Sequence, residues 1–309
     1  MAATMADFAR QNDSGPNCMT FNSLADFKST GGDRIGAGPV GIILLEDRAE
    51  VDSTVRHHLD MGFKTLIVVG VHDLGVSDEV AKEGQDRIIR VHHDMTADNA
   101  LTDVVNTVID MAAGRWVYYC YNTEYLFFPF CEHRTIGEVC AFSLEERRDS
   151  VLTYVVDLYA ADLNRFPDAV SIEDAHLDRA GYYALARVDR ENNYAERQLD
   201  FFGGLRWRYE EHIPSTRRRI DRISIFRAKQ GLKLRPDHTF SDPEYNTYAC
   251  PWHHSLTATV CSFRTAKALK RNPGSGDQID TFCWRNSAPF RWHSQQLLDL
   301  GLMEPGQWF

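Results

Sequence analysis

Apolar runs alternate with amphipathic stretches along residues 38–130. Residues 40–45, 65–71 and 87–91 are short, mostly apolar runs, typical of strands that are covered on both faces. Apolar residues recur at helical spacing in 51–59 and 100–112, and residues 77–83 predict a further short helix. Strands that alternate with helices through short connections predict βαβ units around a parallel sheet.

A fourth strand is predicted in the stretch 115–126, Arg-Trp-Val-Tyr-Tyr-Cys-Tyr-Asn-Thr-Glu-Tyr-Leu. Its aromatic and β-branched start favours a buried strand. Polar residues then interrupt it before apolar residues resume. Open α/β sheets bind ligands at the carboxyl ends of central strands, so this break is a candidate site. A strand that simply ends in a turn explains the same pattern.

Each of these predicted strands is followed by acidic, amide or imidazole side chains. They are Glu46 and Asp47, His72 and Asp73, His93 and Asp94, and Asn122 to Glu124. In a parallel sheet these strand ends lie on the same side, so the pattern predicts one shared crevice. The general polarity of loops accounts for part of it.

The remainder of the chain gives weaker patterns. Residues 1–37 are rich in small polar residues and predict a loosely structured leader. Residues 151–163 suit a helix, or a strand that leads into one, and the acidic stretch 168–178 predicts a surface loop. Residues 294–300 predict a last helix that ends at Gly301.

Basic residues concentrate between positions 206 and 235, directly after the run Phe-Phe-Gly-Gly-Leu at 201–205. Ten Lys or Arg stand there against three acids, although the whole chain has a formal net charge of −10. One interpretation is a solvated basic face, and the other is a positive wall for a diphosphate or an anionic acceptor.

A histidine pair, His253 and His254, follows Cys250, Pro251 and Trp252. Adjacent residues of an extended chain point in opposite directions, so at most one of the pair faces a common site. With no Glu or Cys three or four residues further on, we expect a ligand contact here rather than a metal site.

Composition narrows the class of function. The acidic balance argues against general binding to nucleic acid, which depends on neutralising phosphates. Seven cysteines without a CxxC pair indicate reduced thiols, so we expect a cytoplasmic protein.

No signal peptide or membrane-spanning run is expected, and contact with a membrane surface stays open. No GxGxxG follows the first predicted strand, and GxxxxGK[ST] and GxSxG are missing from the sequence.

The order of motifs resembles that of family 2-type glycosyltransferases, in a bacterial branch. The resemblance lies in His58 to Phe63 and in Trp116 to Leu126, which matches a strand that runs into an Asp-x-Asp-Glu-Phe-Leu box. Phe202-Gly203-Gly204 with Arg206, the pair His253-His254, and Gln296 to Met303 add to it.

The resemblance implies an α/β fold of the GT-A type, Rossmann-related, with a mixed, mostly parallel sheet, helices on both faces and a C-terminal α+β extension. Residues 38–200 would form the half that binds the nucleotide sugar, and 201–309 the acceptor-side half, within one continuous domain. The activity implied is hexosyl transfer from a nucleotide-diphosphate sugar to a glycan, lipid or protein acceptor, usually with Mn²⁺ or Mg²⁺.

The resemblance also assigns roles. Residues expected at the nucleotide sugar are Glu46, Asp47, His72, Asp73, Asp94, Tyr121, Asn122, Arg206, His253 and His254. The metal would be held by Glu124 and Asn122. Carboxylates beyond the box are the candidate bases, in the order Glu132, Asp157 and Glu173.

The sequence departs from the pattern at the box itself. Its two aspartates fall on Tyr121 and Thr123, so Glu124 is the one hard anionic ligand left. The enzyme would then work with a weak or absent metal and use its basic run, or the fold would serve as a non-catalytic module that binds a protein or glycan. A third hypothesis is a different α/β nucleotide-binding enzyme, which the missing glycine-rich loops disfavour and which a metal held by His72, His93 and Asp94 would support.

Overall fold

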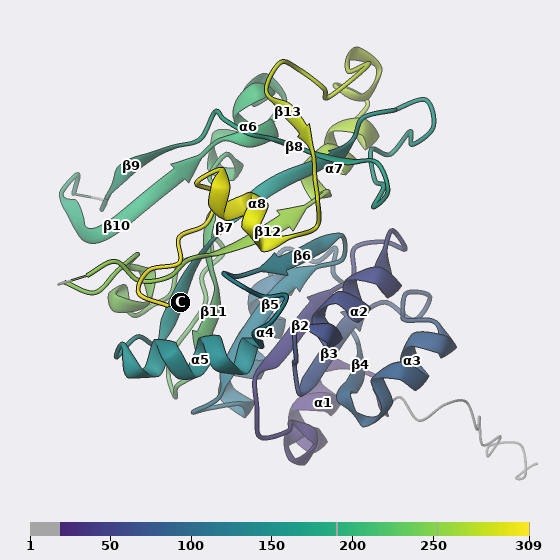
Figure 1. Cartoon of the computed structure of the whole chain (residues 1–309). Helices are drawn as coiled ribbons and strands as arrows, with labels where there is room; N and C mark the ends of the chain where they lie inside the picture. The colour runs from purple at the N-terminus through teal and green to yellow at the C-terminus, as the bar shows by residue number, and fades with distance from the viewer. Residues whose placement is uncertain (1–18, 190, 252, 309) are drawn as a thin grey trace, which may run out of the picture.

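One mixed sheet runs through the molecule, seen in the computed structural model, which describes residues 19–189, 191–251 and 253–308. Its strand order is β1-β4-β3-β2-β5-β11-β7-β12-β6 (Figure 1). The bounds are β1 (Met19–Phe21), β2 (Val40–Leu44), β3 (Thr65–Gly70), β4 (Ile88–His92), β5 (Trp116–Tyr121), β6 (Glu124–Phe127), β7 (Ser150–Ala160), β11 (Asp221–Arg227) and β12 (Ala258–Ser262). Along this path β11 and β6 run against the direction that the other strands share.

Helices cover both faces of the sheet. They are α1 (Leu24–Thr30), α2 (Val51–Asp60), α3 (Asp78–Gly84), α4 (Ala100–Met111), α5 (Ile136–Glu145), α6 (Gly204–Arg208), α7 (Arg264–Arg271) and α8 (Ser294–Asp299). Apolar side chains of α2, α3, α5 and α8 pack on one face, and those of α1 and α4 on the other. Strand β2 contributes side chains to both faces, since Ile43 packs with the first group of helices while Ile42 and Leu44 pack with the second.

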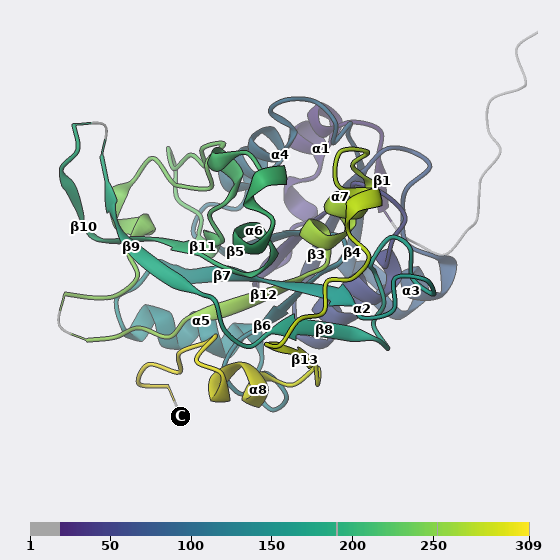
Figure 2. The same cartoon turned by 90° about the horizontal axis from the view of Figure 1, so that it is seen from above.

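Two further pairs of strands lie beyond this path. β8 (Ala175–Asp178) pairs with β7 and with β13 (Ser287–Pro289), while β9 (Tyr183–Val188) and β10 (Tyr194–Phe202) form a separate ribbon. The ribbon extends away from the sheet (Figure 2). Short 3-10 turns at Gly32–Arg34, Gln85–Arg87, Glu210–His212, Ser215–Arg217, Pro243–Asn246 and Gly276–Gln278 complete the described elements.

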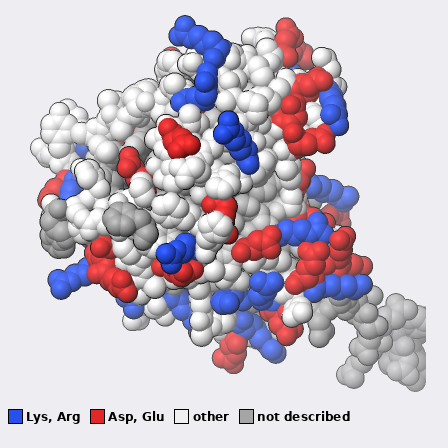
Figure 3. Space-filling model, viewed as in Figure 1, with Lys and Arg blue, Asp and Glu red and all other residues white. Residues whose placement is uncertain are grey.

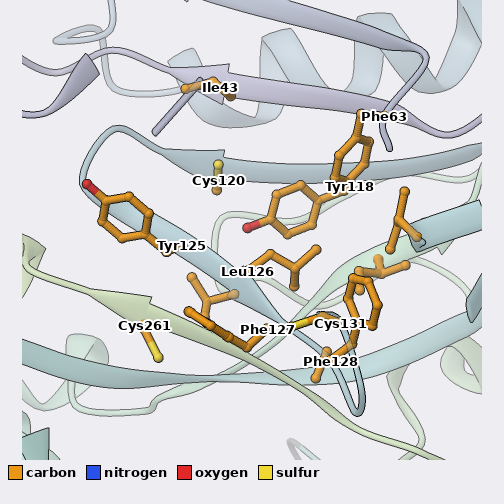
Figure 4. Close-up of a cluster of buried hydrophobic side chains, with 14 of the residues drawn as sticks. Ile43, Phe63, Tyr118, Cys120, Tyr125, Leu126, Phe127, Phe128, Cys131 and Cys261 are labelled. Carbon is orange, nitrogen blue, oxygen red and sulfur yellow. The ribbon is translucent and has the colours of Figure 1, made fainter. Parts of the chain in front are cut away.

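The central strand β5 is buried along its whole length, between β2 and β11. Tyr118 and Cys120 point into the larger hydrophobic cluster together with Phe63 and Tyr125 (Figure 4). His58 of α2 is also fully buried, and its Nδ1 lies 2.7 Å from the carbonyl oxygen of Thr54. Burial lowers the pKa of His58 to about 3, so this ring is a neutral part of the core.

The predicted α/β architecture is confirmed, with a mostly parallel sheet flanked by helices. Three segments differ in detail from the sequence-based expectation. Residues 19–37 form β1 and α1, and Phe27 is fully buried. Residues 150–160 form a single strand, and the predicted loop 168–178 contains β8, whose Asp178 is buried. Residues 1–18 of the expected leader lie outside the described residues.

Candidate functional site

The carboxyl side of the sheet is the side on which β2, β3, β5, β7 and β12 end. Because β11 runs the opposite way, its first residues lie on this side too. Here the buried amide of Asn122 joins the loops after β2 and β5. Its Oδ1 accepts from the Glu46 backbone N–H at 2.9 Å, and its Nδ2 donates to Asp47 Oδ1 and to the Ala49 carbonyl, both at 2.8 Å. The side chain of Asn122 therefore fixes the residues that follow β2.

Glu124 is completely buried and paired with a cation. Arg222, at the start of β11, donates to its Oε2 at 2.6 Å, and Ser262 Oγ lies 3.1 Å from Oε1. The backbone N–H of Tyr121 donates to Oε2 at 2.9 Å. Burial raises the pKa of Glu124, but the charges of Arg222 and Arg264 outweigh it and hold the pKa at about 2. The carboxylate is therefore ionised throughout the physiological range.

Helix α7 presents three cations to the loop after β2. Arg264 donates to both oxygens of Glu46, at 2.7 and 2.6 Å, and its guanidinium lies 3.5 Å from the ring centroid of Tyr121. Lys267 Nζ lies 2.9 Å from Asp47 Oδ2, which also pairs with Arg271. Burial alone would raise the pKa of Asp47, but hydrogen bonds from Lys267, Ala49 and Asn122 hold it well below its usual range.

A second buried carboxylate, Asp157, lies beside the glycine pair that opens α6. Its Oδ2 accepts from the Leu205 backbone N–H at 2.9 Å. Gly204 has a φ of +60°, and a Cβ there would come within 2.7 Å of this oxygen, so the close approach requires glycine. Burial raises the pKa of Asp157 against the opposing charge of Arg206.

Arg206 completes a group of three arginines around this side. It donates to the Arg219 carbonyl at 2.5 Å and to Thr265 Oγ1 at 3.3 Å. Burial lowers its pKa, and the charges of Arg264 and Arg222 add to that effect. Nearby, His238 Nδ1 lies 3.0 Å from Tyr119 Oη, and burial with these three cations lowers its pKa to about 3. Four basic side chains thus share one neighbourhood, and His238 stays neutral in it.

A surface cleft of about 410 Å³ adjoins the loop after β2. It is lined by Arg48, by Glu50, Asp52 and Ser53 at the start of α2, and by Asp73 and Gly75 after β3. In the view of Figure 3, acidic and basic side chains gather most densely over the region of α2 and α3. The cleft is therefore polar, with more carboxylates than cations along its wall.

The residues of the degenerate box do not fit Mn²⁺ or Mg²⁺. Both oxygens of Glu124 are engaged by Arg222, Ser262 and Tyr121, and neither Glu124 nor Asn122 has solvent-exposed surface. The amide of Asn122 is likewise fully engaged within the protein. A hard divalent cation needs several oxygen ligands, and here the one carboxylate already has a guanidinium as its partner.

Other expected nucleotide-sugar residues lie further along this side. His72 and Asp73 follow β3 and are exposed, and the His72 ring stacks on His92 at 3.6 Å. Asp94, after β4, is exposed and accepts hydrogen bonds from Thr96.

The remaining expected residues are not brought to this group. Glu132 accepts from the backbone and Oγ of Ser294 at the start of α8, both at 2.6 Å. Glu173 pairs with Arg165 on the surface. His253 and His254 precede β12, so they lie at the opposite, amino side of the sheet.

Sequence reasoning missed the cations of α7. Their spacing at positions 264, 267 and 271 places them on one helical face, which was a readable signal. Their partners Glu46 and Asp47 are more than 200 residues earlier in the chain, so the pairing itself had no local signature.

Comparisons with known proteins add little. No protein-family model matches the sequence, and no curated protein matches it. Among solved structures, a UDP-glucose pyrophosphorylase from Acinetobacter baumanii is similar, with 9% sequence identity and a TM-score of 0.35 over 78% of this chain and 96% of that chain. Within the described residues, no helix is long and apolar enough to cross a membrane.

Proposed function

We propose that the carboxyl side of the sheet binds a nucleotide-diphosphate sugar and that the protein transfers its hexosyl group to a glycan, lipid or protein acceptor. The observation that carries the proposal is the convergence of Arg222, Arg264 and Lys267 on the ends of β2 and β5. Cationic side chains at this side of an open α/β sheet suit a phosphorylated ligand.

The two parts of the site match the two parts of such a donor. The cleft offers carboxylates, among them Glu50 and Asp73, as acceptors for ribose hydroxyls. Arg48 lines the cleft, and the adjacent Asp47 pairs with Lys267 and Arg271. A nucleoside in the cleft would therefore place its diphosphate next to α7.

Phosphate oxygens can replace Glu46 and Asp47 as partners of the α7 cations. These carboxylates are partly exposed, with 34% and 21% of their side chains accessible, so the pairs can exchange. Fixed cations would then stabilise the charge that develops on the leaving diphosphate, without a metal ion. This arrangement favours the hypothesis of an enzyme that works with its basic residues.

Among the three expected bases, Asp157 has the surroundings that best fit the role. It lies on the carboxyl side next to Arg206, and burial raises its pKa. Its Oδ1 has no hydrogen-bond partner among the described residues. We propose that this oxygen accepts the acceptor's proton, while Glu132 and Glu173 remain weaker candidates.

Thermal unfolding in the presence of nucleotide diphosphates tests the binding step. UDP, GDP, CDP and dTDP are compared, and one is expected to stabilise the protein by about 2.7 kcal/mol at a concentration about 100-fold above its Kd. Arg264→Ala should weaken that nucleotide at least about tenfold, because a hydrogen bond to a charged group contributes about 1.5–3 kcal/mol. Arg227→Ala is the matched control, since Arg227 lies on the surface at the far end of β11. Stabilisation by none of the four would contradict the proposal.

A non-catalytic module is the second candidate, and the burial of Glu124 in an ion pair favours it. Here the site would bind a nucleotide sugar or a glycan and release it unchanged. Sugar transfer measured by product mass separates the two functions. Transfer that is lost in Asp157→Asn but retained in Glu132→Gln would exclude the module, whereas nucleotide binding without any transfer would support it.

A further inference from the structure

We infer a zinc site at the amino side of the sheet, formed by Glu146, Cys250 and His253. Their ligand atoms all lie within 4.8 Å of one another. Glu146 directly follows α5, while the other two residues lie in the loop before β12. The site is thus built from segments about 100 residues apart and is separate from the nucleotide site proposed above.

The three side chains form a donor set that suits zinc. Thiolate sulfur, imidazole nitrogen and carboxylate oxygen are the ligands that tetrahedral Zn²⁺ takes from proteins. One thiolate and one carboxylate balance the charge of the ion, and the imidazole binds in its neutral form. The spacing Cys250-x-x-His253 places two ligands in one short loop, as in many zinc sites.

The cluster lies just beneath the surface of the molecule. Cys250 is 7% exposed, and the side chains of Glu146 and His253 are 18% and 14% exposed, so the cluster is sheltered but reaches the surface. Cys250 Sγ lies 3.4 Å from the Glu146 carbonyl, and His253 Nε2 contacts the Glu146 carboxylate.

Two arginines lie close to the cluster, Arg148 and Arg197. Arg148 lies close to Cys250 through its 3.3 Å bond to the Ala249 carbonyl, and its guanidinium pairs with Glu244 at 3.2 Å. Arg197 also donates to the Ala249 carbonyl, at 2.8 Å, and pairs with the same carboxylate, so Glu244 offsets one of the two guanidinium charges.

Binding of zinc would tie the loop before β12 to the end of α5. The loop leads directly into β12, which pairs with β7 and β6. Zinc is therefore expected to stabilise the fold at this end, and no role in transfer is assigned to it.

Titration of the metal-stripped full chain with Co²⁺ and Zn²⁺ tests the inference. Co²⁺ should produce a thiolate-to-cobalt charge-transfer band that Zn²⁺ abolishes, and Zn²⁺ should raise the unfolding temperature. Cys250→Ser should remove the band, while Cys283→Ser, at a partly exposed cysteine outside the cluster, should retain it. No band in the unmodified chain, or a band that persists in Cys250→Ser, would overturn the site.

Two substitutions that keep the cysteine guard against a variant that fails to fold. Glu146→Gln and His253→Gln should each weaken zinc at least about tenfold, since even outer-shell partners of a metal contribute about 10–100-fold. Unchanged zinc affinity in both variants would show that the thiol binds metal alone and would also overturn the site.

Discussion

At the carboxyl side of the sheet Glu124 is paired with Arg222, whereas at the amino side Glu146 lies beside Cys250 and His253. In both regions one glutamate joins segments that are distant in the sequence: Glu124 begins β6, and Glu146 directly follows α5. In the first, guanidinium groups already satisfy the carboxylate, so the remaining cations can serve an anionic ligand. In the second, a thiol and an imidazole replace the guanidinium, and the set suits a soft cation. The partner of the glutamate therefore determines the sign of charge that each side can bind.

The largest expected effect is on stability, at Glu124. Glu124→Gln should lower the free energy of unfolding by about 3–5 kcal/mol, because Arg222 would remain buried without its counter-charge. Chemical denaturation measures this loss. Glu83→Gln, which removes an exposed partner of Arg56, is the control and should cost less than about 1 kcal/mol. An equal loss in both variants would show that Glu124 is not the anchor of the cationic side.

Acid should lower the free energy of unfolding because His238, on the carboxyl side of the sheet, becomes protonated more readily in the unfolded chain. Its pKa falls from an ordinary 6.5 to about 3 on folding, so its contribution is complete above pH 6.5 and is lost as the pH falls toward 3. In that window His238→Gln should reduce the slope of unfolding free energy against pH by about 1.4 kcal/mol per pH unit. Denaturant titrations at several pH values provide the slope. Identical slopes for the variant and the parent protein would contradict the placement of His238 among the arginines.

Substitution of Gly204 should cause a smaller loss of stability. Gly204→Ala combines a left-handed backbone with a methyl group 2.7 Å from Asp157, and we expect a loss of about 2 kcal/mol. Gly114→Ala is a close control, because Gly114 also has a positive φ, +87°, but a Cβ there meets no atom within 4 Å. Comparison of the two unfolding midpoints separates the steric term from backbone strain. Equal losses would mean that Asp157 is not held tightly by the glycine.

The smallest expected effect is that of bound zinc on the affinity for nucleotide. The two sites lie at opposite ends of the parallel strands and share no residue, so saturation with Zn²⁺ should change nucleotide affinity by less than about 0.5 kcal/mol. Nucleotide titrations of the zinc-loaded and metal-stripped chain measure the coupling. A larger change would show that the two sides do not act independently.

Sequence patterns predicted the helices and strands well where the pattern of apolar residues within one segment determines its structure. The apolar runs that became β2 and β3 and the helical period of 100–112 were sufficient, because burial on both faces of a strand leaves a continuous apolar signature. Asp178 was misplaced on a surface loop, since its partners Arg208 and Trp284 are 30 and 106 residues away.

The candidate sites were predicted less completely. The strand-end positions of Glu46, Asp47 and Glu124 were correctly expected from the parallel sheet, but their partners on β11 and α7 depend on long-range packing. The spacing from Cys250 to His253 was visible in the sequence. Glu146, the third residue of the proposed zinc site, could not be predicted, because only the folding of the chain brings it close to the other two.

The most direct test of the central claim is calorimetric titration with the nucleotide diphosphate that stabilises the protein, in chelator and in Mn²⁺. We predict affinities that agree within about threefold in the two buffers and that fall together in Arg264→Ala, because the cations of the protein replace the metal. Binding that appears only with Mn²⁺, or that is unchanged in Arg264→Ala, would contradict the account.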